Sequence, residues 1–508
     1  MAEKEKGKNA AAGSTTGTKK EREPVDVSRE GEKSGVCGTG GEFRGDFSRD
    51  TFDPQKHYTR VLMQQGRVQL DADWNEQADI VLHTLRELAR DIFGPSGGPD
   101  GDAFKIGVNA KKTDLTIGRG HYYVDGILCG NDHREISYSR QPDYPLSGEQ
   151  KAEMERLIAG DTPFIVWLDV WERHITMLQD KKIRETALNG PDTATRSQLI
   201  WQVRLLEDEP RQKVPDETRG TRNPGKIMCD YIRKNWNRIN PRRRTFPQLK
   251  VRAKISPDTS AEGTVSPGFR YSGVENRLYR VEVHTTGTAS SPARKDGATF
   301  KWSRQNSSVD YPLISVTGTT ATLAAWGRND PSLLTEGDRV EILDDYHALR
   351  QEAGDLVRIE SVDRAGLTVT FLPALSYALH KDKALLRRWD YREDLPHGGG
   401  KLKSGAIPIE EGTNEAGWIE LEDGVQIQFQ PGDHSYHTGD YWLIPARTIT
   451  GDVGWPWDET GEQPRPPLGI AHHTAPLAVV YRKDGLLTTC SCRCLFHPPC
   501  GSSLRGEG

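Results

Sequence analysis

The chain has 508 residues, a formal net charge of -5 and a hydrophobic fraction of 35%, with a mean hydropathy of -0.69. The negative charge gives no overall case for nucleic acid as a partner, no run approaches the ~18 apolar residues of a membrane helix, and seven cysteines are too few for a disulfide scaffold. The length suits about three domains, and 51 glycines with 30 prolines favour short strands and many turns.

Residues 1–42 are predicted to be a disordered arm. They contain almost no large apolar side chain and are rich in Lys, Glu, Gly, Ser and Thr, so they cannot bury enough surface to offset their ordering entropy. A flexible leader is the favoured interpretation, and an arm that orders on a partner subunit is the alternative. Because the N-terminus lacks the apolar core of a secretory signal, we expect synthesis in the cytoplasm and release, if any, by lysis or a non-standard route.

Residues 43–100 are predicted to form a strand–turn–helix docking unit. Gly66 lies between polar residues, as a tight turn requires. Val68 and Leu70 alternate with polar residues, which is the pattern of a half-buried strand.

A helix follows, with Asp73 as its predicted N-cap, Glu76 completing a capping box, and Gly94 at its end. Its apolar residues recur at spacings of three and four: Ala78, Val81, Leu82, Leu85, Leu88, Ala89 and Ile92. This stripe needs a cover, either the β domains or a neighbouring subunit, and we expect Leu82, Leu85 and Ile92 to be buried. The predicted interface residues of the unit are Met63, Arg67, Leu70, Trp74, Leu82, Leu85 and Ile92.

Residues 101–210 are predicted to be a β-rich domain with one helix. The Asp-Gly pair at 125–126 is a favoured hairpin turn, and residues 147–159 have the apolar spacing of a helix. Residues 164–175 are rich in β-branched and aromatic side chains and predict the strongest strand, with residues 201–206 as its partner.

Residues 211–250 change in character and are predicted to be a basic insertion or linker. Between positions 219 and 254 there are twelve Lys or Arg residues and one acid, Asp230. Basic residues with an interleaved aromatic are typical of nucleic-acid contact, but a solvated face or a site for an acidic partner protein is favoured because the whole chain is acidic. The stretch includes Arg233, Lys234, Trp236, Arg238, Arg242, Arg243 and Arg244.

The remaining chain returns to short strands. Residues 251–395 predict a small barrel or sandwich, in which 337–373 form a three-stranded, barrel-like meander. Residues 396–508 predict a C-terminal β domain with a Cys-rich end, closed by a hairpin of 475–481 with 486–490. The predicted fold class is therefore mainly β with a short N-terminal helical docking unit, α+β overall, with several small β-sandwich or barrel-like domains.

The Cys-rich end offers thiolates and an imidazole at a density that can bind zinc. The residues are Cys490, Cys492, Cys494, His497 and Cys500. The C-x-C-x-C spacing is tighter than the C-x2-C of a zinc ribbon, so free or cross-linking thiols are favoured over a metal site. No other cofactor is expected, because the chain has no Walker A loop, dinucleotide fingerprint or nucleophile elbow.

Three further groups of residues invite a functional interpretation. Four histidines, His434, His437, His472 and His473, are consistent with a two-His site with Asp433 or Asp440, but packing is favoured because ligand spacing is absent. Neighbouring Glu172, Arg173 and His174 resemble a catalytic group, but on a strand only Glu172 and His174 share a face, and an ion pair explains them equally well.

Tyr441, Trp442, Trp455 and Trp457 lie close in sequence. If exposed, they would form a platform for stacking on sugars. Burial as core or interface anchors is the favoured alternative.

Long runs in one fixed order carry a family resemblance: 45–75, 168–176, 190–196, 201–204, 275–284, 300–309 and 439–448. Over roughly residues 43–500 the chain resembles a family of uncharacterised proteins encoded with phage-tail-like contractile injection systems. The resemblance implies a structural subunit at the baseplate or tail fibre that acts through protein–protein assembly. Its expected partners are other particle subunits and, because such particles have rotational symmetry, copies of itself.

Two alternatives remain open beside this interpretation. One is a fibre module that binds a cell-surface glycan or receptor. The other is a particle-associated cargo or an enzyme acting on polysaccharide, which needs two carboxylates facing each other across a cleft. The sequence identifies no such pair, so a non-enzymatic role is favoured.

Overall fold

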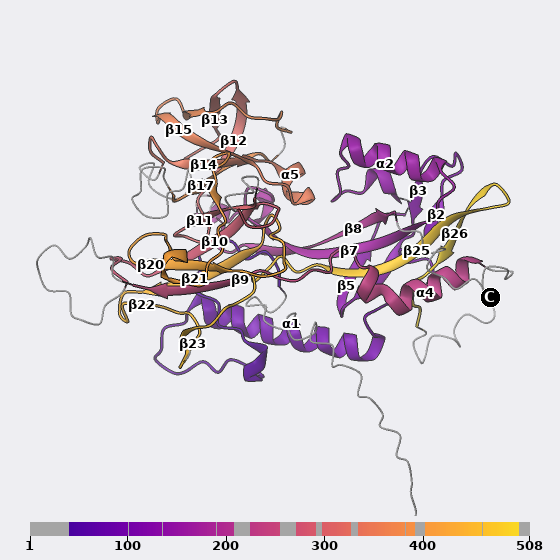
Figure 1. Ribbon diagram of the computed structural model, residues 1–508, viewed down its shortest axis with the longest axis horizontal. Helices are drawn as coiled ribbons and strands as arrows, with labels where there is room; N and C mark the ends of the chain where they lie inside the picture. Colours follow the sequence, from indigo (N-terminus) through magenta and orange to yellow (C-terminus); the bar gives the residue numbers. More distant parts are fainter. Residues whose placement is uncertain are drawn as a thin grey trace, which may run out of the picture. The chain divides into compact units, whose positions relative to one another are not determined.

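Figure 1 shows the computed structural model of the protein. The structure describes residues 40–99, 101–134, 136–188, 190, 192–207, 224–254, 271–290, 297–326, 334–380, 383–391, 402–459 and 461–496. These residues belong to one compact unit. The predicted fold class is confirmed, because strands far outnumber helices and arrange into several sheets and one closed barrel. The predicted arm, residues 1–42, lies outside the described residues except for its last three positions.

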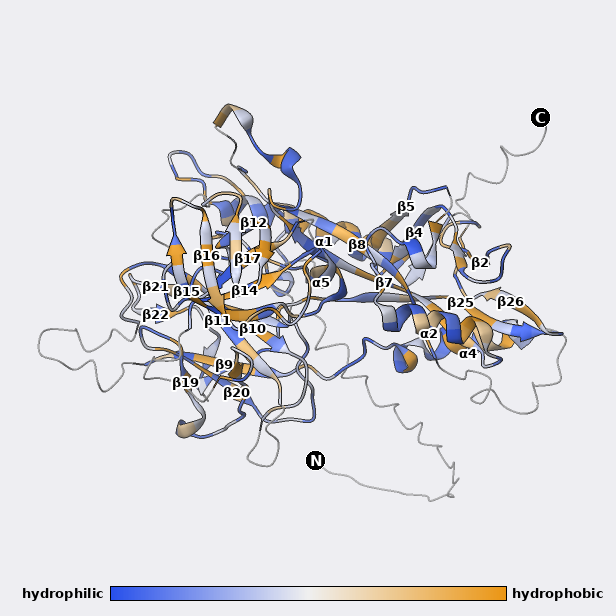
Figure 2. Cartoon of the chain, turned by 90° about the horizontal axis from the view of Figure 1, so that it is seen from above, coloured by the Kyte–Doolittle hydropathy of each residue, from blue (hydrophilic) through white to orange (hydrophobic). Residues whose placement is uncertain are grey.

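A four-stranded antiparallel sheet has the order β26-β25-β7-β8. Its strands are β7 (Phe164–Ile175), β8 (Arg196–Leu206), β25 (His473–Lys483) and β26 (Leu486–Ser491). The predicted pairing of β7 with β8 is confirmed, with Val170 opposite Trp201. The predicted closing hairpin is confirmed as β25 and β26. Long apolar stretches on these strands (Figure 2) reflect burial of the sheet on both faces.

Two small sheets and two helices cover this four-stranded sheet. One sheet joins β1 (Ser96–Gly97), β4 (Gly120–Val124) and β5 (Ile127–Asn131), and the other joins β2 (Ile106–Val108), β3 (Leu115–Ile117) and β6 (Ile136–Ser137). The predicted Asp-Gly hairpin turn is confirmed between β4 and β5. The predicted helix is confirmed as α2 (Gly148–Ala159), whose N-cap Ser147 accepts a hydrogen bond from the Gln150 N–H.

Most of the predicted basic linker is ordered structure. It contains helix α4 (Pro224–Ile239) and strand β9 (Gln248–Ala253). The apolar side of α4 packs on β25 and β26 through residues such as Met228, Ile232 and Trp236. The basic residues of α4 lie between these apolar residues in the sequence. The run of charge is therefore part of an amphipathic helix.

A second layer of sheets is built from the middle and the end of the chain. The five-stranded sheet β18-β11-β10-β21-β22 and the three-stranded sheet β19-β20-β9 share one apolar core, and a short hairpin joins β23 to β24. The bounds are β10 (Arg277–Thr285), β11 (Thr299–Ser303), β18 (Ile407–Pro408), β19 (Ile419–Glu420), β20 (Val425–Gln430), β21 (Tyr441–Arg447), β22 (Asp452–Val453), β23 (Trp457–Asp458) and β24 (Gly461–Glu462).

The closed barrel has six strands in the order β12-β13-β16-β15-β14-β17. The predicted meander over 337–373 is confirmed, because β14, β15 and β16 are successive neighbours. Short α5 follows β14. The bounds are β12 (Asp310–Thr317), β13 (Thr320–Leu323), β14 (Arg339–Leu343), α5 (Asp345–Arg350), β15 (Asp355–Asp363), β16 (Thr368–Leu372) and β17 (Leu385–Trp389).

The strands of residues 396–508 belong to different sheets. β21 pairs with β10, β20 pairs with β9, and β25 pairs with β7. The last part of the chain therefore completes sheets begun by earlier segments. In the part of the chain that the structure describes, 3-10 helices fill connections at η3 (Pro54–Lys56), η4 (Tyr138–Arg140), η5 (Lys181–Ile183), η6 (Thr186–Leu188) and η10 (Glu415–Gly417).

Candidate docking surface

Helix α1 (Asp71–Phe93) is the predicted docking helix, and it begins earlier than predicted. Its N-cap is Leu70, and the carboxylate of Asp73 accepts a hydrogen bond from the Leu70 N–H at 3.1 Å. The prediction of Asp73 as the N-cap is thus wrong, because this acid reaches back to the cap instead of forming it. Glu76 accepts a hydrogen bond from the Thr51 hydroxyl at 2.6 Å, which ties the helix to the preceding segment.

The predicted strand before α1 is absent from the structure. Gly66 forms the predicted turn, with a φ of 71°, but no strand occurs between residues 57 and 70. Val68 is 83% exposed. Alternation of apolar and polar residues makes a strand only where another strand can pair with it, and none of the described strands pairs with this segment.

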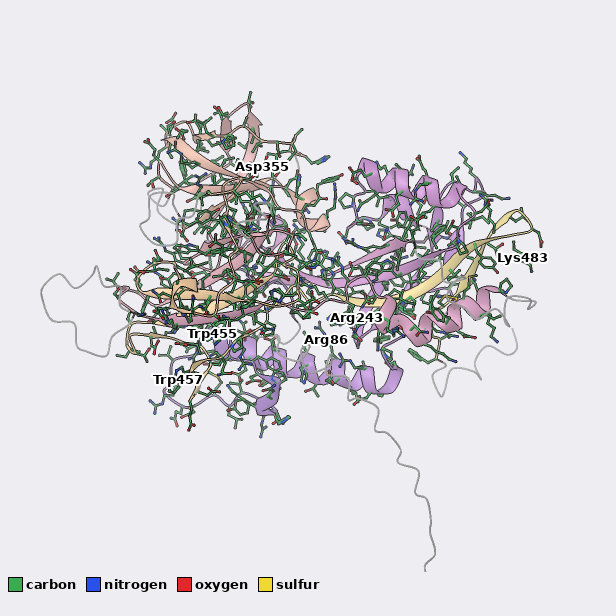
Figure 3. All side chains as sticks on the ribbon, viewed as in Figure 1. Arg86, Arg243, Asp355, Trp455, Trp457 and Lys483 are labelled. Carbon is green, nitrogen blue, oxygen red and sulfur yellow. A yellow bond between two sulfur atoms is a disulfide. The ribbon has the colours of Figure 1, made fainter. Side chains whose placement is uncertain are left out.

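One side of α1 is fastened to the rest of the protein by polar contacts and close backbone packing. Arg86 forms an ion pair with Glu172 of β7 at 2.6 Å, and Figure 3 shows Arg86 on the side of the helix toward the strands. A Cβ atom at Gly126 would lie 2.0 Å from the Arg86 carbonyl oxygen, so the β4–β5 turn touches the helix backbone. At the last turn, the Phe93 ring stacks on Phe496 with 4.3 Å between centroids.

The fastened side of α1 is unusually poor in apolar residues. Only Ala72 and Ile80 of the helix are fully buried. Beside them, the pKa of Asp79 is raised to about 6 by burial and by the nearby Glu172 carboxylate, while Arg86 opposes both. A carboxyl group on the inner side of an amphipathic helix reverses the usual arrangement.

The apolar stripe of α1 faces solvent instead. We call this stripe the α1 seam, and it consists of Trp74, Ala78, Val81, Leu85, Leu88 and Ile92. All six are exposed, and the five large side chains are between 49 and 70% exposed. Their spacing alternates strictly between four and three residues, which is the a/d pattern of helices that pair with another helix.

Large apolar residues before the helix are exposed as well. They are Tyr58, Leu62, Met63, Val68 and Leu70, and together with the α1 seam they make up what we call the docking face. Six of the seven predicted interface residues are exposed on this part of the chain, and Leu82 is half-buried. Of the two covers that the sequence allows, the β domains do not bury Leu85 and Ile92, and burial by a neighbouring subunit stays a prediction. Monomeric proteins rarely leave large apolar surfaces open to water, and ten large apolar side chains are exposed between Tyr58 and Ile92.

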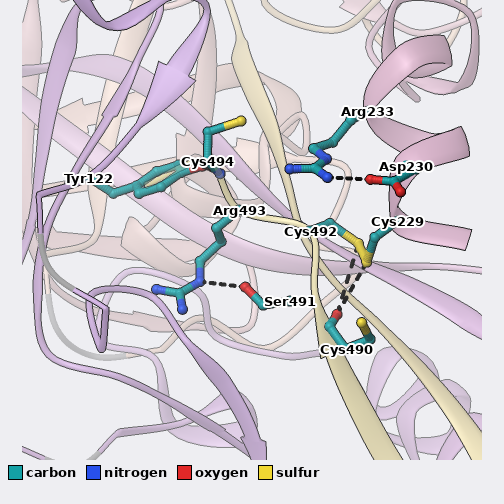
Figure 4. Close-up of a disulfide and its surroundings, with 9 residues drawn as sticks. All are labelled: Tyr122, Cys229, Asp230, Arg233, Cys490, Ser491, Cys492, Arg493 and Cys494. Carbon is teal, nitrogen blue, oxygen red and sulfur yellow. Dashed lines mark hydrogen bonds and ion pairs between the residues drawn. A yellow bond between two sulfur atoms is a disulfide. The ribbon is translucent and has the colours of Figure 1, made fainter. Parts of the chain in front are cut away.

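The Cys-rich end is arranged around a disulfide (Figure 4). Cys492 is bonded to Cys229 of α4, 263 residues away, whereas Cys490 and Cys494 are free thiols. His497 and Cys500 lie outside the described residues. Among the residues that the structure does describe, no three His, Cys, Asp or Glu side chains are grouped for a metal ion. A disulfide-bonded Cys492 has no thiolate to offer zinc. Cys229 could not be paired with Cys492 from sequence, because their spacing carries no signal.

The four predicted platform aromatics do not share an exposed surface. Tyr441 and Trp442 are completely buried in β21. Trp455 is half-buried, and its indole N–H donates to the Gln463 carbonyl at 2.9 Å. Trp457 alone is well exposed, and Figure 3 labels both Trp455 and Trp457. The arrangement matches the core interpretation for two of the four residues and offers a sugar only one aromatic face.

The histidines occupy separate environments. His434 contacts Glu411 at 3.0 Å, and His473 contacts Asp125 at 3.0 Å. His472 is buried, which lowers its pKa to about 4 despite its contact with Asp169 at 2.6 Å. Each of these rings is held by an acid of the fold, which is the packing role that the sequence favoured.

The basic stretch is divided between internal ion pairs and surface. Arg242 bonds to the buried carboxylate of Asp169 at 2.6 Å. Arg244 binds Asp440 with two parallel hydrogen bonds, a strong geometry for a guanidinium. Trp236 is buried, and the exposed members are Arg233, Lys234, Arg238 and Arg243.

Glu172 and its neighbours also serve the fold. Glu172 pairs with Arg86 as described, and Arg173 pairs with Asp345 of α5 at 2.5 Å. Burial lowers the pKa of His174 to about 3, so this ring is neutral at pH 7. These partners come from helices that lie against β7 and not from a neighbouring strand.

Sequence reasoning missed a buried ionic cluster between the five-stranded sheet and the barrel. The Lys301 ammonium lies 2.6 Å from Glu341 of the barrel and 3.3 Å from Glu282 of the sheet. Glu282 also binds Arg44 at 2.8 Å. Alternation on a strand predicts which residues share a face, but it does not show that a face is covered by another sheet.

A cavity of about 410 Å³ lies beside Glu411, lined also by Glu410, Asn414 and Pro431. The Glu411 carboxylate accepts a hydrogen bond from the Tyr436 hydroxyl at 2.9 Å. This acid is therefore engaged by the fold, and the other polar side chains that line the cavity are Glu410, Thr413 and Asn414. The docking face remains the feature that the fold leaves without a structural explanation.

No helix among the described residues combines the length and the apolarity needed to cross a bilayer.

Comparison with known proteins places the chain in a family. No curated protein and no solved structure matches it. A family model described as "Family of unknown function (DUF6519)" matches residues 43–217 and 216–505, which is most of the chain and includes the docking face. The protein therefore belongs to the DUF6519 family.

Proposed function

We propose that this protein is a structural subunit of a phage-tail-like contractile injection particle, at the baseplate or tail fibre, and that it acts through protein–protein assembly. The exposed docking face is the observation that carries the proposal. The contractile context comes from the sequence resemblance, and the assembly role is supported by the outward-facing α1 seam.

The energetics of α1 favour a partner. Each large side chain of the α1 seam is 49–70% exposed and would contribute roughly 1–2 kcal/mol if its burial were completed, and none of that is gained in the isolated chain. Meanwhile Arg86 and Phe93 hold the helix in place. A preorganised helix loses little conformational entropy on docking, so more of the contact energy remains as affinity.

The Cys229–Cys492 disulfide is consistent with a particle that works outside the cell. Disulfides persist in oxidising surroundings and are rare in the reducing cytosol. A subunit made in the cytoplasm and released by lysis would meet such surroundings after assembly.

Genetic and biochemical tests in the producing strain address this proposal directly. Particles are purified from strains that express the wild-type chain, a Leu62→Asp/Val68→Asp variant or no chain. Wild type is expected to co-purify with particles, and the variant is expected to be lost from them, because two carboxylates in the docking face oppose its desolvation. A Leu188→Asp/Ile314→Asp chain is the matched control, since these residues are also exposed aliphatics and lie outside the docking face.

Electron microscopy of the strain that lacks the chain then gives its position. Missing or broken baseplates support a baseplate subunit, and intact particles that no longer adhere to cells support a fibre subunit. Particles that assemble and adhere normally, together with a wild-type chain that never co-purifies, would contradict the proposal.

A further inference from the structure

We infer that the α1 seam pairs with the α1 seam of a second copy of this chain, in an antiparallel, two-fold symmetric helix pair. This inference rests on the proposed assembly role and names the partner of one part of the docking face. Segment 58–70 is left for other subunits.

The α1 seam is symmetric about His83. When two copies of the helix run in opposite directions and cross at this residue, each seam position meets another seam position. Trp74 of one copy then lies against Ile92 of the other, Ala78 against Leu88, and Val81 against Leu85. The small Ala78 thereby faces a large leucine, as interdigitated packing requires. A two-fold interface must be self-complementary in this way.

A parallel pair lacks this match. In register, it would set Trp74 against Trp74 and Ala78 against Ala78, so that a crowded layer adjoins a gap. It would also bring together two first turns that both carry Asp71 and Asp73. The antiparallel pair instead places each acidic first turn beside a last turn that contains Arg90, and it opposes the helix dipoles.

The flanks of the α1 seam carry one acid and no base, and on one of them the Val61 N–H donates to the Gln77 side chain at 2.9 Å. On one flank lie Gln77, Thr84 and Asp91, and on the other lie Asn75, Leu82 and Ala89. In the antiparallel pair Asp91 faces Gln77, and Leu82 faces its own copy. No charged side chain of these flanks faces another of the same sign, so binding demands no like-charge contact.

The exposed area of the α1 seam suits a dimer that forms in a concentration-dependent way. The seam runs over nineteen residues, from Trp74 to Ile92, which is about 27 Å of helix. Its five large side chains are 49–70% exposed. The seam alone therefore presents on the order of 500 Å², compared with about 800 Å² per partner in a standard interface.

Sedimentation velocity on the purified full-length chain tests the pairing. Wild type is expected to shift with concentration from 56.7 kDa to twice that mass. Leu85→Asp is expected to weaken the dimer about 100-fold or more, because each dimer contains the substitution twice. The control, Leu188→Asp, alters a leucine that is 60% exposed, close to the 56% of Leu85, and should dimerise as wild type does.

A photo-cross-link tests the direction. With p-benzoylphenylalanine in place of the exposed Asp91, irradiation should join this position to residues 74–78 of the other copy. Within one helix those residues are about 20–25 Å away, so this product can form only between copies. Cross-links between position 91 and residues 88–92 of the other copy would show a parallel pair and overturn the inference.

Two further results would overturn self-pairing. One is a dimer that persists in Leu85→Asp. The other is a wild-type chain that stays monomeric over a roughly 100-fold range of protein concentration. If the monomeric chain still enters particles through segment 58–70, the proposed assembly function stands without the dimer. If it neither dimerises nor enters particles, both are contradicted.

Discussion

Buried charges connect the five-stranded sheet to the barrel, in addition to the apolar contacts that Leu356 and Trp389 of the barrel make in the core of that sheet. Lys301 of the five-stranded sheet reaches Glu341 of the barrel, and the Trp389 indole N–H donates to the same carboxylate at 3.0 Å. Burial would raise the pKa of Glu341, but Lys301, His284 and Arg387 together outweigh that effect and lower the pKa to about 2. The carboxylate is therefore charged at neutral pH, and Lys301 is its nearest cation.

Lys301→Met is expected to lower the free energy of unfolding by about 3–5 kcal/mol, because it leaves Glu341 charged and unpaired in the interior. Adding Glu341→Gln should recover a large part of the loss, since the amide needs no counter-charge. Urea unfolding measures both, with exposed Lys234→Met as a control expected to stay within about 0.5 kcal/mol of wild type. If the Lys301→Met variant is as stable as wild type, the ion pair contributes nothing to the free energy of unfolding.

A second prediction concerns the carboxyl group of Asp79, which lies on the inner side of α1. The pKa of Asp79 is about 6 in the folded chain and 3.8 ordinarily, so the folded state holds a proton that the unfolded state releases between these values. Its contribution to stability is present below about pH 4 and is lost as pH rises through about 6. Asp79→Asn should therefore stabilise the protein by about 2–3 kcal/mol at pH 7.5 and by little at pH 4.

Thermal unfolding at the two pH values measures this difference, and exposed Asp132→Asn serves as the control for removal of one carboxylate. An equal effect of Asp79→Asn at both pH values would mean that this carboxyl group is not buried as described.

At the scale of elements, the sequence predicts what local chemistry determines. The Asp-Gly turn at 125–126, helix α2 and the β7–β8 pair all follow from patterns of neighbouring residues. The alternation at Val68 fails because no strand is present to pair with it. The apolar stripe of α1 was predictable, but its outward direction was not, since periodicity gives a face and not its neighbour.

The contact between the β4–β5 turn and α1 gives an element-scale prediction. Gly126→Ala should loosen α1, because φ is 78° and a Cβ atom would lie 2.0 Å from the Arg86 carbonyl oxygen. Hydrogen exchange in residues 80–93 should rise at least about tenfold, which corresponds to about 1.4 kcal/mol.

Gly485→Ala is a matched control, since Gly485 also follows an aspartate in a hairpin turn, with a φ of 73° and no atom within 4 Å of its added Cβ. The control should show the cost of the backbone conformation alone and leave exchange in α1 unchanged. If both variants loosen α1 equally, the turn does not support the helix.

At the scale of the whole described chain, long-range closures determine the fold. β25 and β26 complete a sheet whose other strands lie more than 260 residues earlier, and the Cys229–Cys492 bond fastens α4 to the end of β26. Such pairings have no sequence spacing that encodes them, which is why the last segment was predicted as a separate domain and the disulfide partner was not identified.

The disulfide should therefore contribute substantially to stability. It closes a loop of 263 residues, and limiting the unfolded chain over so long a loop is worth about 3–5 kcal/mol.

Cys492→Ser is expected to lower the unfolding temperature by several degrees, and reduction of the wild type should lower it by a similar amount. The free, exposed Cys494 provides the control, because Cys494→Ser removes a thiol and no cross-link. Mass spectrometry of the alkylated, unreduced chain should recover the peptide pair that contains Cys229 and Cys492. If Cys492→Ser unfolds at the wild-type temperature, the closure between α4 and β26 is maintained by the packing of Met228, Ile232 and Trp236 without the covalent bond.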